Sequence, residues 1–329
     1  MARLSIIIPC WQQIELLERT LVSVLQHRTP EFDVLVVHPG TYEDPYGLSG
    51  EVTFIEVDES CHIVAAINSA IRAAKCDIVH LLECGVEVQE GWTDAALRHF
   101  DDTAVGSVAP IVLDADHPTV IQAAGARMGF GGSAKSCGQG QQLRAKTLRR
   151  LRPVAPSMHA GFYRKSALEI AGMFEPKVGY ARAALDMAFS LCHLGYLARF
   201  EPASQTYLAL ADARVTNRPF ENGRQAERLI WRNAVNRSWM KTWAARLPCI
   251  FLETIGGLLR PKQLAKPLGR ISAWSEWARY RRHHRKLQTN TQFVTKIATQ
   301  NSGTNVRIDG PHHDVNQRGA TRSTTVHVN

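Results

Sequence analysis

The stretch IVHLLECGVEV, from Ile78 to Val88, decides the fold class of this chain. Its first five residues, Ile78 to Leu82, form a short and mostly apolar run, which is typical of a strand buried in a parallel sheet. The run ends in Glu83-Cys84-Gly85. Because open α/β sheets bind their ligands at the carboxyl ends of the strands, the sequence predicts a functional site directly after Leu82.

Predicted strands alternate with predicted helices upstream of this run. We expect strands at Leu4–Pro9, Phe32–Val37 and Val52–Val57, and helices at Ile14–Gln26 and Ile63–Ala74. Apolar residues in the first helix recur on one face, at Leu17, Leu21, Val24 and Leu25. This alternation favours βαβ units and a mostly parallel sheet.

Further elements are predicted downstream. They are a helix at Trp92–Phe100, a strand at Val105–Leu113, a strand and helix within Met158–Gly172, a helix at Leu185–His193 and a strand at Tyr196–Phe200. Residues 125–140 contain six glycines and open no helical pattern. We therefore expect a flexible loop there, and not a phosphate-binding turn.

The C-terminal third differs in composition. Residues 222–287 are predicted to be helical, with breaks near Pro248, at Gly256-Gly257 and between Pro261 and Pro267. Residues 288–329 are rich in Thr, Asn, Gln and Ser and poor in aromatic residues, so we expect them to be disordered.

Composition places the chain among ordinary globular proteins. It has 329 residues, 45% hydrophobic and 21% charged, and no apolar run reaches the roughly 18 residues of a membrane span. The N-terminal residues MARLSIIIPC lack the cleavage site of a signal peptide, and the seven cysteines form no CxxC pair. These features predict a cytoplasmic protein with reduced thiols.

The net charge of +9 is unevenly distributed. Lys+Arg minus Asp+Glu is 18 − 24 = −6 for residues 1–213, 17 − 4 = +13 for 214–287 and 4 − 2 = +2 for 288–329. Five of the seven tryptophans lie in the basic segment. One interpretation is peripheral contact of 222–287 with the inner face of a membrane. The other is that these helices pack on the body. No nucleic-acid motif accompanies the charge, so we do not expect nucleic acid as a partner.

Five blocks of sequence resemble, in order, the family 2 glycosyltransferases of the GT-A fold. They are LSIIIPCW (4–11), ELLERTLVSVLQH (15–27), AAINSAIRAAKCDIVHLLECGVEVQEGW (65–92), AGFYRKSALEIAGMFEP (160–176) and LDMAFSLCHLGYLARFEP (185–202). The likeness covers roughly residues 3–210. It implies an α/β fold, a Rossmann-like and mostly parallel sheet flanked by helices, here with a C-terminal helical extension.

The resemblance also implies an activity and a division of the chain. The family transfers a sugar from a nucleotide-sugar donor to a glycan or lipid-linked acceptor, often in cell-envelope polysaccharide biosynthesis. Residues 1–112 would form the donor half, 113–212 the acceptor half, 213–287 the basic extension and 288–329 the tail.

Four positions of the likeness belong to donor binding. Pro9 and Trp11 follow the first strand, where the family walls its donor pocket. His38-Pro39-Gly40 stands in place of the family's nucleobase-binding Asp-Asp-Gly, so His38 is the candidate contact to the base. Asn68 is kept, although the family's preceding Arg is Ile67 here.

The metal and base positions depart from the family. Glu83-Cys84-Gly85 replaces the DxD motif, which leaves Glu83 as the candidate ligand of a divalent cation, Mg²⁺ or Mn²⁺. A single carboxylate suffices where substrate phosphates supply further ligands. The family's general base falls on Ala183-Ala184, and Asp186 is the carboxylate that could take its place.

Two hypotheses of different classes follow. The chain is either a glycosyltransferase with an altered metal site, or a catalytically inactive relative that binds a sugar or a partner protein. Convergence of Glu83, Asp186 and His38 on one open cleft would favour catalysis.

Overall fold

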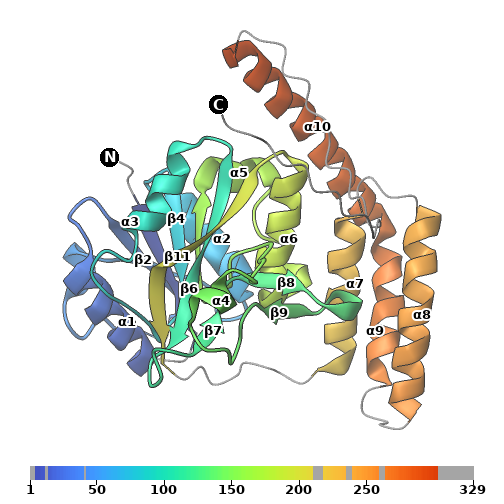
Figure 1. The fold of residues 1–329 in the computed structure, drawn as a ribbon, viewed down its shortest axis with the longest axis horizontal. Helices are drawn as coiled ribbons and strands as arrows, with labels where there is room; N and C mark the ends of the chain where they lie inside the picture. Colours follow the sequence, from blue (N-terminus) through green and yellow to red (C-terminus); the bar gives the residue numbers. More distant parts are fainter. Residues whose placement is uncertain are drawn as a thin grey trace, which may run out of the picture.

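The computed structural model describes residues 4–11, 14–40, 42–209, 218–234, 239–258 and 264–302. An α/β body carries one large sheet with helices on both faces, and a group of helices from the C-terminal third stands at one side of it (Figure 1).

The large sheet contains nine strands in the order β3-β2-β1-β4-β10-β6-β11-β5, with β7 paired to β6. The strands are β1 (Leu4–Pro9), β2 (Asp33–His38), β3 (Thr53–Glu56), β4 (Ile78–Leu82), β5 (Val86–Val88), β6 (Val105–Asp114), β7 (Ile121–Ala123), β10 (Ala160–Arg164) and β11 (Leu197–Leu208). Pairing is parallel across β3-β2-β1-β4 and between β11 and β6, and β10, β5 and β7 run antiparallel to their neighbours. The predicted βαβ half is thus confirmed, and antiparallel strands complete the sheet.

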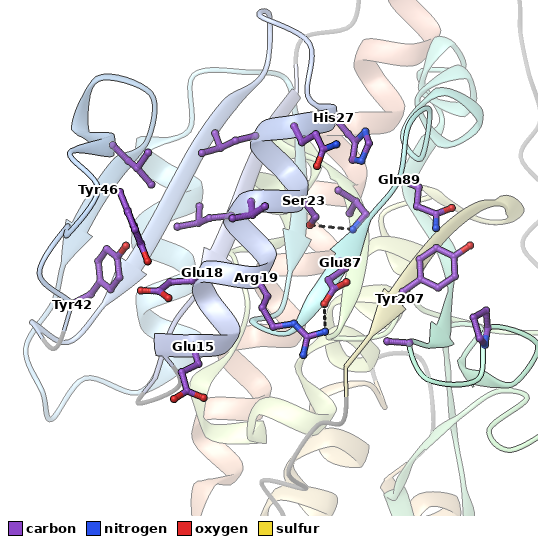
Figure 2. A pocket seen from close by; sticks show the side chains of 18 residues that line it. Glu15, Glu18, Arg19, Ser23, His27, Tyr42, Tyr46, Glu87, Gln89 and Tyr207 are labelled. Carbon is purple, nitrogen blue, oxygen red and sulfur yellow. Dashed lines mark hydrogen bonds and ion pairs between the residues drawn. The ribbon is translucent and has the colours of Figure 1, made fainter.

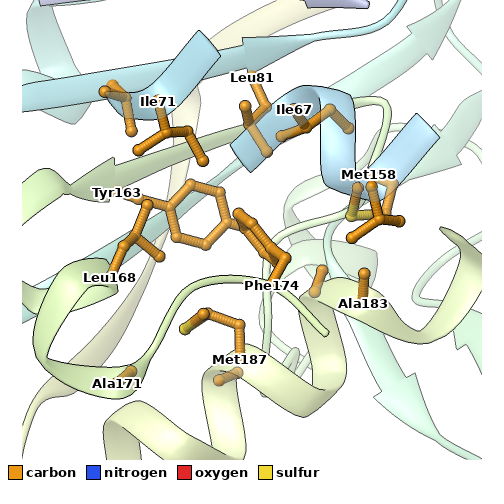
Figure 3. Packing of buried hydrophobic residues seen from close by; sticks show 14 of the residues in the cluster. Ile67, Ile71, Leu81, Met158, Tyr163, Leu168, Ala171, Phe174, Ala183 and Met187 are labelled. Carbon is orange, nitrogen blue, oxygen red and sulfur yellow. The ribbon is translucent and has the colours of Figure 1, made fainter. Parts of the chain in front are cut away.

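Alternation of side chains along β1 builds a core on each face of the sheet. Leu4, Ile6 and Ile8 pack with α1 (Ile14–His27) and α3 (Asp94–Arg98), and Ile7 faces the opposite cluster. That second cluster is formed with α2 (Ile63–Ala73), α5 (Lys165–Ala171) and α6 (Tyr180–His193) (Figure 3). All six strand residues of β1 are buried, which is why the first strand lacks the polar alternation of an exposed sheet.

Glycines of the body agree with the sequence prediction at one position and differ from it in one segment. Gly172 ends α5 as predicted, with a φ of 95° and its N–H donating to the Leu168 carbonyl at 3.0 Å. The glycine-rich residues 125–140 are not a flexible loop. They form a hairpin of β8 (Ala126–Met128) and β9 (Ala134–Ser136), five of the six glycines have positive φ, and two of these five, Gly131 and Gly132, lie close to the extension.

The C-terminal extension consists of α7 (Pro219–Arg232), α8 (Trp239–Leu258), α9 (Ala265–Ala273) and α10 (Trp277–Ser302). The break expected at Pro248 is absent, because α8 continues through this proline. Residues 288–302, which we expected to be disordered, continue α10, and its buried Leu287 and the Asn290 and Thr291 contacts hold it against the body. The remaining tail, 303–329, lies outside the described residues.

Arginines fasten this extension to the body. Arg232 of α7 pairs with Asp186 of α6 at 3.1 Å, and Arg270 of α9 donates to the Gly131 carbonyl at 2.7 Å. Within the extension, fully buried Glu227 pairs with Arg246 and Arg270 at 2.9 and 3.0 Å. Many basic residues of the C-terminal third therefore neutralise buried carboxylates, in agreement with packing on the body. Among the described residues, no helix combines the length and the hydropathy needed to cross a membrane.

Candidate active site

The carboxyl ends of β1, β2 and β4 meet at one edge of the sheet. In the strand register Pro9 lies opposite Val37, and Ile7 lies opposite Leu81. His38 and Glu83 therefore flank the end of β1 from its two sides. The backbone continues this contact, because the Cys10 N–H donates to the Val37 carbonyl at 2.9 Å. The strand ends that carry Pro9, His38 and Glu83 thus lie side by side, with the His38 side chain on the face that holds Tyr42 and Phe54 and the Glu83 side chain on the opposite face.

Glu83 is paired with a histidine that the sequence did not single out. Its carboxylate, 9% exposed, accepts a short hydrogen bond from Nδ1 of His159, whose side chain is 30% exposed. The Glu83 N–H also donates to the His159 carbonyl at 2.9 Å, extending the ladder between β4 and β10. With Glu83 ionised, Nδ1 carries the proton, and the more exposed imidazole is held at the strand edge.

Gly85 occupies a backbone conformation that favours glycine. Its φ is 88°, and its N–H donates to Thr20 Oγ1 of α1 at 2.9 Å. A Cβ at this position would lie 3.4 Å from Leu16 and 3.5 Å from the Ala209 carbonyl. An aspartate would therefore be strained here. The backbone of this turn favours glycine at the position where the family has its metal-binding Asp.

His38 lies in an aromatic corner at the end of β2. Its ring centroid is 6.1 Å from that of Tyr42 and 6.2 Å from that of Phe54. Burial lowers the pKa of His38, an effect that Glu56 opposes. His38 Nδ1 and the Tyr42 hydroxyl are both buried without a hydrogen-bond partner among the described residues. Two unsatisfied polar atoms in one aromatic corner suit the edge of a planar heterocycle.

Trp11 and Asn68 have packing roles. Trp11 is half-buried and packs against the core cluster that α2 and α6 share. The Asn68 amide donates to the Phe174 carbonyl at 2.8 Å and accepts from the Phe174 N–H at 3.1 Å. The Asn68 side chain thus ties α2 to the segment after α5.

Asp186 does not join Glu83 and His38. It is 2% exposed, and both its oxygens accept from Arg232 at 3.1 to 3.2 Å. Asn233 Nδ2 adds a bond at 2.8 Å. Burial acts to lower the pKa of Arg232, but Asp186 and Glu175 outweigh it and raise this pKa. The Asp186 carboxylate is thus enclosed between α6 and α7, which does not suit a base that must reach an acceptor hydroxyl.

The strand edge offers few ligands for a cation. Among the described residues, no group of three or more His, Cys, Asp or Glu side chains is arranged to hold a metal ion. Glu83 and His159 together provide one carboxylate and one imidazole. This set fits a cation that takes most of its ligands from phosphate and water, and it does not fit a site formed by the protein alone.

A groove of about 1020 Å³ runs along α1 and reaches the aromatic corner. Tyr42 and Tyr46 lie on one side of the helix, and Glu87 and Tyr207 lie on the other (Figure 2). Arg19 bridges the groove by pairing with Glu87 at 2.6 Å. Glu87 is therefore engaged at the surface, away from Glu83.

The sequence did not predict three residues as candidates for the site: His159, Tyr42 and Glu221. His159 and Tyr42 follow no spacing that links them to Glu83 or His38, since strand pairing and a loop bring them there. Glu221, at the start of α7, acts electrostatically on both His62 and Arg182. Its carboxylate accepts from Arg228 at 3.2 Å, and Arg228 also donates to the Lys177 carbonyl, three residues before α6, at 2.7 Å.

Comparisons with known proteins bear on the fold. No protein-family model matches the sequence, and a search of curated proteins finds no match. Solved structures do match. They include the Pyrobaculum calidifontis mannosyltransferase PcManGT in complex with GDP-Man and Mn²⁺, with a TM-score of 0.52, 14% identity and coverage of 84% of this chain and 87% of that one.

Two further structures are similar. GalNAc-T7 with UDP, GalNAc and Mn²⁺ has a TM-score of 0.58 and 14% identity, and the match covers 91% of this chain but 58% of that one. Residues 1–349 of S. aureus TarS give a TM-score of 0.54 at 14% identity, with 93% and 94% covered. The molecule thus has the GT-A glycosyltransferase fold, as the sequence resemblance implied.

Proposed function

We propose that this chain is a glycosyltransferase of the family 2 type that transfers a sugar from a nucleotide-sugar donor to a glycan or lipid-linked acceptor. The observation that carries the proposal is the pairing of Glu83 with His159 at the strand edge that also holds His38. Two of the similar structures contain Mn²⁺ together with GDP-Man or with UDP and GalNAc. Residues 1–112 would bind the donor and 113–212 the acceptor.

Different residues at the strand edge contact the nucleobase and the diphosphate of the donor. The nucleobase of the donor enters the aromatic corner, where His38 Nδ1 and the Tyr42 hydroxyl gain the hydrogen-bond partners they lack among the described residues. The diphosphate lies over the end of β1, beside the His159 imidazole. Glu83 orients this imidazole so that its ring can donate a hydrogen bond to the leaving diphosphate.

A divalent cation fits this scheme with Glu83, or Glu83 and His159, as its protein ligands. When bound, such an ion neutralises the leaving diphosphate. The protein contribution remains to position Glu83 on β4 and His159 on the antiparallel neighbour β10.

We assign the proton acceptor to Glu221. Asp186 is bound by Arg232, whereas the Glu221 carboxylate is 37% exposed and accepts a single described bond, from Arg228 at 3.2 Å. Arg228 keeps Glu276 at 2.6 Å if Glu221 is changed, so a substitution at Glu221 leaves no buried charge without a partner.

Release of nucleotide from a panel of UDP- and GDP-sugars tests the proposal. Glu221→Gln is expected to lower turnover by about 10² to 10⁴-fold, which is the usual contribution of a general base. Glu87→Gln, on the far side of α1, serves as the matched control and should leave turnover unchanged. Equal turnover of the wild type and Glu221→Gln would remove Glu221 from the mechanism.

A second candidate function is favoured by the lack of an accessible carboxylate at the family's general-base position. Ala183 and Ala184 replace the family's base pair, and Asp186 is enclosed. The chain would then be an inactive relative that binds a sugar or a partner protein. Nucleotide binding without nucleotide release, across the whole donor panel, would select this function over transfer.

A further inference from the structure

An aromatic cavity lies in the C-terminal extension, where α7 ends and α10 begins. Its volume is about 560 Å³, within the usual ligand-site range of roughly 300–1,000 Å³. We use the name aromatic cavity for the space lined by Trp231, Trp243, Trp274, Trp277, Tyr280 and Arg281.

The four indoles form a continuous aromatic wall. Trp231 lies edge-to-face with Trp243 at 5.4 Å and with Trp277 at 5.3 Å between ring centroids. Trp243 lies 4.1 Å from Trp274. These contacts join helices α7, α8 and α10 through side chains, so the cavity is built from fixed elements and its shape is preorganised.

Several polar groups of the wall already have partners inside the protein. The Trp231 and Trp274 indole N–H groups donate to Glu227 at 2.9 and 3.4 Å. The Tyr280 hydroxyl donates to the Ala273 carbonyl at 2.8 Å. The part of the wall formed by Trp231, Trp274 and Tyr280 thus offers ring surface whose polar groups are already engaged. Sugars and nucleobases need such groups when they are buried, whereas an alkyl chain does not.

The rim of the cavity is cationic. Arg281 lines it and belongs to a basic ridge on α10, which we define as the exposed residues Arg281, Arg282, Arg285 and Lys286. Within the described part of the chain, none of the four makes an ion pair. Residues 277–302 contain no Asp or Glu, so repulsion along the ridge is relieved only from outside the helix.

An apolar strip adjoins the cavity along α8. Arg246 and Glu253 point inward to their ion pairs. Met240 is 63% and Phe251 is 65% exposed, and the strip they define also includes Leu247, Leu252 and Ile255. Exposed apolar surface of this extent, in the same helical extension as unpaired cations, is typical of a contact with a lipid surface.

We propose that the aromatic cavity takes the apolar chain of a phosphate-bearing lipid, whose headgroup pairs with the basic ridge of α10. The occupant is a lipid of an anionic membrane surface, and the apolar strip of α8 rests on the same surface. The ring wall provides the apolar contact, and the ridge provides the charge complementarity that selects phosphate over a neutral headgroup.

This lipid site is separate from the strand edge and does not depend on sugar transfer. The residues that line the cavity come from the C-terminal extension, whereas Pro9, His38, Glu83 and His159 belong to the body.

The test uses the full chain and measures tryptophan fluorescence during titration with octyl, decyl and dodecyl phosphate, each below its micelle concentration. Affinity is expected to rise by about fourfold for each methylene that enters the cavity. Inorganic phosphate and dodecyl maltoside are the probes for charge alone and for an apolar chain alone, and neither should saturate. A second arm measures sedimentation with phosphatidylcholine vesicles, with and without phosphatidylglycerol.

Matched variants separate the cavity from general charge. The double variant Arg281→Gln/Arg282→Gln is expected to weaken dodecyl phosphate binding by about 25-fold, because each cation contributes about fivefold to the affinity. Trp277→Ala, at a residue 40% exposed, removes one wall and should flatten the dependence on chain length. Arg149→Gln with Arg150→Gln removes the same charge from an exposed part of the body and should change neither titration nor sedimentation.

Three results would overturn the proposal. One is dodecyl phosphate affinity that does not depend on chain length or on Trp277. Another is sedimentation with anionic vesicles that Arg149→Gln/Arg150→Gln weakens as much as Arg281→Gln/Arg282→Gln. The third is tighter binding of a single-stranded oligonucleotide with the same dependence on Trp277 and Arg281, which would assign the cavity to nucleic acid.

Discussion

Asp186 illustrates how one side chain can meet a sequence criterion and fail a structural one. It lies near the family's base position, yet Arg232 and Asn233 enclose its carboxylate. A buried ion pair contributes little net stability, but removing one member leaves the other charge without compensation. The residue is therefore expected to matter for folding and for attachment of α7.

Asp186→Ala is expected to lower the free energy of unfolding by about 3–5 kcal/mol, because Arg232 stays buried with only Glu175 beside it. Urea denaturation measures the change. Glu87→Ala, which breaks the more exposed pair with Arg19, should cost less than about 1 kcal/mol. Loss of turnover in Asp186→Ala at an unchanged unfolding midpoint would return Asp186 to the role of base.

His80 couples stability to pH. It is fully buried and its ring stacks on Phe162 at 3.8 Å, and burial lowers its pKa to about 3. An unfolded chain binds a proton at His80 near pH 6.5, whereas the folded chain does not until about pH 3. The contribution of neutral His80 to the free energy of unfolding is therefore fully present above pH 6.5 and is lost as the pH falls from 6.5 toward 3.

Between pH 6.5 and pH 5, His80 is expected to reduce the free energy of unfolding by about 2 kcal/mol, at about 1.4 kcal/mol per pH unit. His80→Gln should remove this part of the pH dependence, measured by urea titrations at each pH. His117→Gln, at an exposed histidine, is the control and should leave the slope unchanged. An equal slope in wild type and His80→Gln would show that His80 is protonated in the folded state.

Helices and strands of the body follow from local sequence. Ile14 to His27 carries apolar residues at helical spacing, and the glycine at 172 supplies the positive φ that ends α5. The hairpin at 126–136 does not follow from local sequence. Its strands are three residues long, and its glycines are needed because α7, α8 and α9 approach them closely. Contacts between distant segments decided this element.

The crossing of α7 and α9 gives a test at the scale of these elements. A Cβ on Gly269 would lie 1.9 Å from the Phe220 carbonyl oxygen, which is backbone and cannot move aside alone. Gly269→Ala is expected to lower the free energy of unfolding by about 1–3 kcal/mol or more. Gly50→Ala, where a Cβ meets nothing within 4 Å, is the matched control and should be nearly neutral. Equal unfolding midpoints for Gly269→Ala and wild type would contradict this close crossing.

Across the whole molecule, the sequence predicted the sheet edge but not all of its chemistry. Pro9 and His38 end strands and Glu83 follows one, so parallel pairing was enough to align their backbones at this edge. His159 precedes β10, and the antiparallel pairing of β10 with β4, which places it on Glu83, has no local signature. The packing of the extension also has no local signature, because its arginines pair with carboxylates of the body and of the extension that are distant in sequence.

Binding of the donor nucleotide at this edge can be measured by calorimetric titration of the full chain with UDP and with GDP, each with and without Mn²⁺. We predict that one nucleotide binds with a Kd on the order of 1–100 μM, in the usual range for enzyme substrates. Glu83→Gln should weaken this binding by about tenfold, as expected when a charge-assisted hydrogen bond is lost. No binding of either nucleotide, with or without Mn²⁺, would contradict the account.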